Sequence, residues 1–220
     1  MSDFINTVDV IGDEALVSSI VDRTIKEIAD NTIQTMRNYA FSYCDKLESV
    51  DLPACETISS DCFAYCTNLV HVNLPLATSA TYQAFQGCQN LKTLRLPSAT
   101  SMGSNAFSNC YKLKRTDFSL NISIMNSFSG CHSLIALILR SESLCVMGGD
   151  RLSSCSHFTG TVNATYNPDG LKDGYIYVPR ALVEQYKVAT NWSVYASQFR
   201  ALEDYTVDGT IHGKLDESKI

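Results

Sequence analysis

The chain has 220 residues, of which 45% are hydrophobic, and a formal net charge of −6 at pH 7. That length and apolar content suffice for one substantial domain with attachments at its ends. The acidic balance argues against a nucleic-acid partner, which needs a concentrated Lys/Arg face, and no apolar run reaches the roughly 18 residues that predict a membrane-spanning helix.

Residues 1–30 are predicted to form an N-terminal extension and a capping helix. Apolar residues recur at helical spacing in DEALVSSIVDRTIKEIADN, and acidic residues stand at its start. They are Leu16, Val17, Ile20, Ile25 and Ile28. A cover over the first coil is the main interpretation, and a partner-binding helix is the alternative. The opening MSDFINTVDVIGDEAL shows neither a basic n-region nor an apolar h-region, so it does not predict a secretory signal.

Residues 31–165 consist of a repeated motif, F-x-x-C-x-x-L-x-x-V-x-L-P, with a period of 22 residues. Its lines include FSYCDKLESVDLP, FAYCTNLVHVNLP and FQGCQNLKTLRLP. The phenylalanines that open the five copies are Phe41, Phe63, Phe85, Phe107 and Phe128. This period falls in the range of leucine-rich repeats, in which each turn adds one short strand to a parallel sheet. The predicted fold is therefore an α/β repeat: a leucine-rich-repeat solenoid with a parallel β-sheet.

Alternation along each predicted strand separates a core side from an outer side. Residues such as Val50 and Leu52 are expected to point inward, and the residues between them outward. The outward set varies in size and charge from copy to copy and is the candidate interaction ridge. Its members are Ser49, Asp51, His71, Asn73, Thr93, Arg95, Arg115, Asp117, Ala136 and Ile138, with Arg140 continuing the basic side. A solvated face without a ligand is the alternative interpretation.

One cysteine recurs in every copy, at the same interval as the phenylalanine. The five are Cys44, Cys66, Cys88, Cys110 and Cys131. Equivalent positions of a parallel stack lie about 4.8 Å apart, so these cysteines are predicted to form an interior column of small packing residues. Metal or nucleophilic sites at Cys62/Cys66, at Cys131/His132 or at Cys155/His157 are the weaker alternatives, because none has paired zinc-ligand spacing. The roles of Cys145 and Cys155 are left open.

Residues 166–202 are predicted to close the array. GYIYVP alternates like a final strand, and RALVEQYKVATNWSVYASQFRAL reads as helical, with Trp192, Tyr195 and Phe199 as an apolar cluster. Residues 203–220 contain Asp208-Gly209, a hairpin signal, followed by a charged tail. Such termini outside the array favour attachment to a larger assembly, and frayed ends are the alternative.

The repeat lines and the segment GYIYVPRALVEQYKVATNWSVYASQF resemble BspA-like leucine-rich-repeat proteins, including those encoded by phages and prophages of gut Firmicutes. The resemblance implies a non-catalytic module without a cofactor that binds a protein or a surface glycan. It further implies a receptor-facing accessory protein of a phage virion, made in the bacterial cytoplasm and attached to other virion proteins through its termini. An adhesin on the bacterial cell surface is the alternative. Tyr43, Tyr65 and Tyr111 are candidate aromatic contacts for a sugar.

Overall fold

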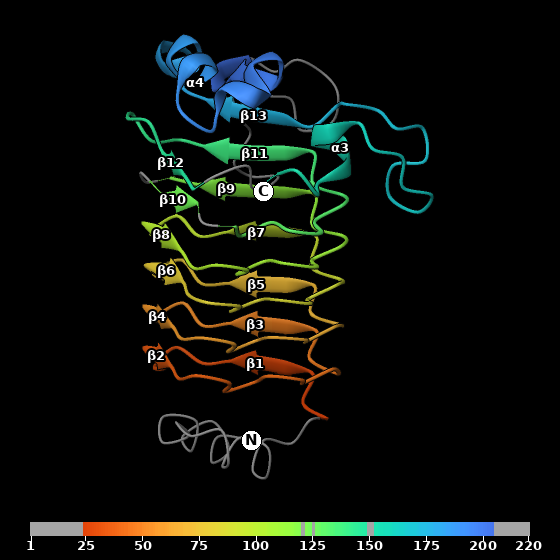
Figure 1. Ribbon diagram of the computed structural model, residues 1–220. Helices are drawn as coiled ribbons and strands as arrows, with labels where there is room; N and C mark the ends of the chain where they lie inside the picture. Colours follow the sequence, from red (N-terminus) through yellow and green to blue (C-terminus); the bar gives the residue numbers. More distant parts are fainter. Residues whose placement is uncertain (1–23, 120–121, 125, 149–151, 205–220) are drawn as a thin grey trace.

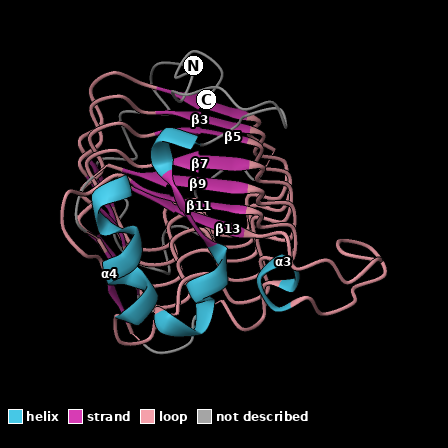
Figure 2. Ribbon diagram, turned by 90° about the horizontal axis from the view of Figure 1, so that it is seen from above, coloured by secondary structure: helices cyan, strands magenta, loops and turns pink. Residues whose placement is uncertain are grey.

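The computed structural model describes residues 24–119, 122–124, 126–148 and 152–204. These residues form a stack of similar coils, each of which adds one strand to a front sheet and a shorter strand to a second sheet (Figures 1 and 2). All strand pairs of the two stacks are parallel. The predicted parallel solenoid is confirmed.

The front stack follows the V-x-L part of the repeat and falls into two hydrogen-bonded groups. The first group contains β1 (Glu27–Ala29), β3 (Ser49–Asp51) and β5 (His71–Asn73). The second contains β7 (Thr93–Arg95), β9 (Arg115–Phe118), β11 (Ala136–Leu139), β13 (Tyr175–Val178) and β14 (Phe199–Ala201). Strands β5 and β7 are neighbours in the stack (Figure 1) but no strand pairing joins them within the described chain.

The second stack is one six-stranded sheet of two-residue strands. It contains β2 (Thr35–Met36), β4 (Thr57–Ile58), β6 (Ser79–Ala80), β8 (Ser101–Met102), β10 (Ser123–Ile124) and β12 (Val146–Met147). The second residue of each of these strands is buried. One coil alone would expose both its faces, so stacking is what buries the apolar side chains.

The core consists of continuous columns of identical or similar side chains. The five repeat phenylalanines are fully buried, and consecutive rings stack with centroids 5.3–5.8 Å apart. Val50 and Leu52 also point into the core as predicted, whereas Val72 is only half-buried. Each added coil therefore extends every column by one residue, which makes stability depend on nearest neighbours.

The array begins earlier than the helical prediction allowed. Glu27–Ala29 form β1, which pairs with β3 and buries Ile28 beside Val50. The predicted helix is therefore wrong over these residues, because the spacing of Ile25 and Ile28 repeats that of Leu47 and Val50 in the next coil. The remainder of the predicted helix and the extended residues 2–11 lie outside the described residues.

The C-terminal end of the stack is closed as predicted, with one difference. After β13 come η2 (Arg180–Leu182), α4 (Val183–Val188), η3 (Ser193–Gln198) and η4 (Leu202–Asp204), with β14 before η4. Residues 199–201, expected in a helix, pair instead with β13 as the last strand of the front stack. The hairpin expected around Asp208 lies outside the described residues.

Side chains of this cap satisfy the backbone at the end of the second stack. Tyr186 Oη accepts from the Cys145 N–H at 2.7 Å, and Trp192 Nε1 donates to the Cys145 carbonyl at 2.8 Å. Asn191 Nδ2 donates to the Met147 carbonyl at 2.7 Å. An open strand edge is a template for further pairing, and these bonds occupy it. Cys145 is thus a buried attachment point for the cap, which settles a role that the sequence left open.

Candidate functional site

The repeat cysteines are buried and chemically inert. All nine cysteines of the chain are free thiols with buried side chains. In five successive coils the thiol donates to the carbonyl of the phenylalanine one coil earlier, at 3.0–3.2 Å: these are Cys66, Cys88, Cys110, Cys131 and Cys155. Cys155 therefore belongs to the column, in the short α3 region (Ser156–Thr159).

Burial raises the pKa of these thiols. The pKa values of Cys66, Cys88 and Cys131 are well above the ordinary range, and that of Cys110 is about 12, because desolvation disfavours the thiolate. A nucleophilic or metal-binding cysteine needs the opposite shift. The column is a packing and hydrogen-bonding feature.

The histidines named as alternatives have structural partners. His157 Nδ1 lies 2.6 Å from Asp173 Oδ1 and its Nε2 lies 3.0 Å from the Tyr166 carbonyl. His132 Nδ1 lies 3.2 Å from Ser156 Oγ, and its ring packs with those of Tyr111 and Tyr166 in a triangle of three rings with centroids 5.8–6.0 Å apart. Among the described residues, no three His, Cys, Asp or Glu side chains are placed to hold a metal ion.

The tyrosines considered as sugar contacts belong to two separate groups of stacked rings. Tyr43 stacks on Tyr65 with centroids 4.9 Å apart, and the Tyr43 side chain is largely exposed. Tyr111 belongs instead to the stack with His132 near the loop before β13. Tyr43 and Tyr65 occupy turn positions with φ of +61°, where Gly87 and Gly130 stand in later coils. The sequence pattern alone did not distinguish these two groups.

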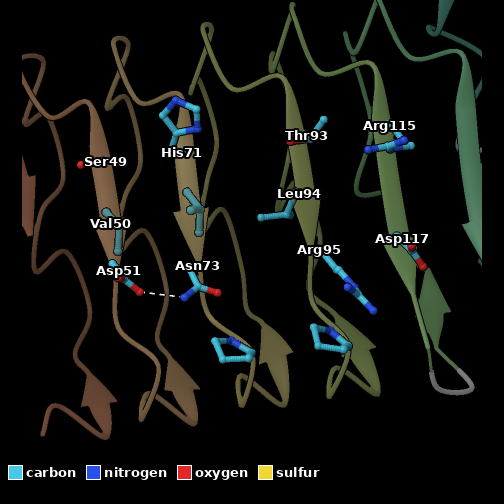
Figure 3. A pocket seen from close by; sticks show the side chains of 13 residues that line it. Ser49, Val50, Asp51, His71, Asn73, Thr93, Leu94, Arg95, Arg115 and Asp117 are labelled. Carbon is cyan, nitrogen blue, oxygen red and sulfur yellow. Dashed lines mark hydrogen bonds between the residues drawn. The ribbon is translucent and has the colours of Figure 1, made fainter. Parts of the chain in front are cut away.

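The outer face of the front stack is hollowed where the two groups of strands meet. The hollow has a volume of about 820 Å³ and is lined by residues of β3, β5, β7 and β9 (Figure 3). Eight of the ten predicted ridge residues line it: Ser49, Asp51, His71, Asn73, Thr93, Arg95, Arg115 and Asp117. Because each strand contributes its two outward residues, these side chains form two rows across the strands. The predicted ridge is in fact concave.

The missing pairing between β5 and β7 lies in the middle of the hollow. Elsewhere in the front stack, main-chain bonds such as Leu52 N–H to the Asn73 carbonyl and Leu96 N–H to the Asp117 carbonyl join adjacent coils. Within the described chain no such bond joins β5 to β7. Val72 and Leu94 of these strands line the floor. This interruption was not detectable in the repeat motif.

The two C-terminal residues of the predicted ridge, Ala136 and Ile138, are covered by the cap, so the prediction that they are exposed is wrong. Ala136 and Ile138 point to the outer face, as alternation required, but they are buried with Tyr177 and Leu202. Leu202 follows β14, so the segment after the last strand folds back over this face. Only the tertiary arrangement of the cap could reveal this cover.

Asp117 is also buried, and it is neutralised by an arginine from the next coil. Arg140 Nε donates to Asp117 Oδ1 at 2.7 Å and Arg140 Nη2 donates to Oδ2 at 2.8 Å. The Asp117 side chain is 1% exposed, whereas that of Arg140 is 17% exposed. This two-bond geometry is the strong form of a carboxylate–guanidinium pair. The Arg140 charge is therefore engaged by Asp117 and does not extend a basic surface.

Replacing Arg140 with leucine is expected to lower the free energy of unfolding by about 3 kcal/mol, because a buried carboxylate then loses its counter-ion. Chemical denaturation measures the effect. The matched variant is Asp117→Asn with Arg140→Leu, which removes the orphan charge and should recover a large part of the loss. Equal stability of the single and double variants would contradict the pairing.

The comparisons with known proteins agree with this architecture. The family model described as BspA type leucine rich repeat region matches in six copies, over residues 3–114 and 57–166. The chain belongs to this family. No curated protein matches the chain significantly.

Several solved structures are similar to this BspA-type repeat protein. The pneumococcal vaccine antigen PcpA has a TM-score of 0.55 and 15% identity over 80% of this chain and 40% of its own. A leucine-rich cell surface protein from Faecalibacterium prausnitzii has a TM-score of 0.47 and 21% identity over 60% of this chain and 43% of its own. The chain thus spans less than half the length of either structure, and the likeness to PcpA supports the fold. Within the described residues, no helix has the length and apolar content to cross a membrane.

Proposed function

We propose that this protein is a non-catalytic interaction module that binds a protein or a surface glycan in the hollow of its front sheet. The observation that carries the proposal is the difference in sequence variation between the core positions and the outward positions of the coils. The core positions repeat the same residue types in every coil, whereas the outward positions change from Ser49 to His71 to Thr93 in one row. Repeat arrays use such surfaces for partners, and the volume lies in the range of roughly 300–1,000 Å³ seen for ligand clefts.

We further propose that the module acts on a bacterial cell surface. The similar solved structure from Faecalibacterium prausnitzii is described as a cell surface protein, and the pneumococcal one as a vaccine antigen. The placement in a phage virion, which the sequence resemblance implied, stays a second prediction. Mass spectrometry of purified particles and of surface-shaved cells would separate the two placements.

Thr93→Trp is expected to abolish ligand binding, because an indole at this exposed position fills the hollow. Labelled protein would be applied to arrays of glycans and extracellular proteins, and the retained ligands remeasured with the variant. The matched control is Thr57→Trp, which places the same side chain at an exposed position of the second sheet. Loss of binding by at least about ten-fold in Thr93→Trp alone supports the proposal. Equal binding by both variants would remove the hollow as the binding surface.

A further inference from the structure

Two arginines, Arg95 and Arg115, line the hollow, and the described residues provide no counter-ion in contact with Arg95. The cross-strand neighbour of Arg95 is Asp117, the register partner on β9. Both carboxylate oxygens of Asp117, however, are taken by Arg140. Neither an ion pair nor a hydrogen bond within the described residues involves the Arg95 guanidinium. A positive charge therefore stands open to a ligand on a protein whose net charge is −6.

The Arg95 side chain is half-buried. Its Nε is buried without a hydrogen-bond partner, while its terminal nitrogens are not among the buried unpaired atoms. The aliphatic part and Nε of Arg95 thus lie against the sheet, and the terminal guanidinium nitrogens remain accessible from the hollow (Figure 3). A guanidinium fork matches the planar geometry of a carboxylate and binds it through two hydrogen bonds.

The groups around Arg95 favour hydroxyl-bearing partners. Asn73 donates its Nδ2 to Asp51 Oδ1 at 2.7 Å, which leaves the Asn73 amide oxygen and the second Asp51 oxygen as acceptors (Figure 3). Thr93 and His71 are exposed in the other row. Hydroxyl groups can both donate to and accept from such a lining.

The position of Asp51 argues against a polyanionic peptide. Asp51 is two strands from Arg95, or about 10 Å at the spacing of adjacent strands. A second carboxylate placed there would meet a like charge, whereas a hydroxyl would donate to it. Resting on the proposed binding function, we infer that the hollow binds an oligosaccharide that carries one carboxylate, held by Arg95, next to a neutral sugar whose hydroxyls contact Asp51 and Asn73.

The test uses two acidic sugars, sialyllactose and a glucuronic-acid-terminated lactose, each with its methyl ester. The ester keeps the shape and removes the charge. Calorimetric titration is expected to show binding of at least one acid, and about ten-fold weaker binding of its ester. Arg95→Gln should remove the difference between acid and ester, and Arg95→Lys should keep part of it. Lys112→Gln, the same charge change at an exposed position outside the hollow, should have no effect.

Three outcomes would overturn the inference: no binding of either acid, equal binding of acid and ester, or tighter binding of a hexaglutamate peptide. The last would assign the hollow to an acidic protein segment. The ligand-array experiment with Thr93→Trp distinguishes failure of the acidic-glycan inference from failure of the proposed binding in the hollow. Array binding that this variant abolishes, with no acid binding, rejects the acidic glycan alone, whereas array binding that it leaves intact rejects the hollow itself.

Discussion

Phe85→Ala is expected to lower the free energy of unfolding by about 3–5 kcal/mol, as for other fully buried aromatic side chains. The Phe85 ring is completely buried and stacks on Phe63 at 5.3 Å and on Phe107 at 5.6 Å. Its removal therefore weakens the contacts of one coil with both neighbours. Because each coil is stabilised mainly by its two neighbours, this loss weakens the coupling between the coils before Phe85 and the coils after it. Urea denaturation followed by circular dichroism measures it.

The control for Phe85→Ala is Thr93→Ala in the same coil. Thr93 is exposed on the outer face, so its truncation should change the free energy of unfolding by no more than about 0.5 kcal/mol. Similar losses in the two variants would contradict the assignment of inner and outer positions. A low-stability transition confined to part of the array in Phe85→Ala would show directly that the coils couple through this column.

Raising the pH from 8 to 10.5 is expected to destabilise the protein by several kcal/mol through its cysteine column. An unfolded thiol has a pKa of about 8.5, whereas burial raises the pKa of Cys110 to about 12 and those of Cys66, Cys88 and Cys131 well above the ordinary range. Above the unfolded pKa the unfolded chain binds fewer protons than the native one. Stability is therefore fully present below about pH 8.5 and falls as the pH rises toward 12.

The magnitude follows from the number of thiols. Each thiol that stays protonated in the folded protein and ionises in the unfolded chain contributes a loss of about 1.4 kcal/mol per pH unit above about pH 8.5. Denaturation curves between pH 8 and 10.5 in the presence of a reductant would measure the slope. Cys88→Ala with Cys110→Ala should flatten it by about 2.8 kcal/mol per pH unit, and an unchanged slope would refute the role of the column.

The repeat motif was sufficient to predict the core of this protein. Phenylalanine, cysteine and leucine at a period of 22 residues can be buried only if equivalent positions stack, so the columns and the inward side of each strand followed from spacing alone. The same reasoning predicted that the cysteines pack inside. It did not predict that their thiols donate to phenylalanine carbonyls one coil earlier, because that bond depends on the offset between coils.

The errors arose where local patterns allowed two structures. Ile25 and Ile28 fit helical spacing and also the strand of a first coil, and contact with β3 decides for the strand. Residues 199–201 continue a helical pattern, but the unpaired edge of β13 recruits them as a strand. In both cases hydrogen bonds to an existing edge outweigh a weak local preference.

The sequence by itself determined the repeat, the buried columns and the set of residues on the outer side, because side-chain direction in a strand alternates with a fixed period. Only the tertiary structure decided which of those outer residues remain open. The return of Leu202 over Ile138, the pairing of Asp117 with Arg140 and the missing ladder between β5 and β7 join segments distant in the chain. The energies of these contacts depend on how each coil is positioned relative to the others. A motif within one coil carries no information about that relative position.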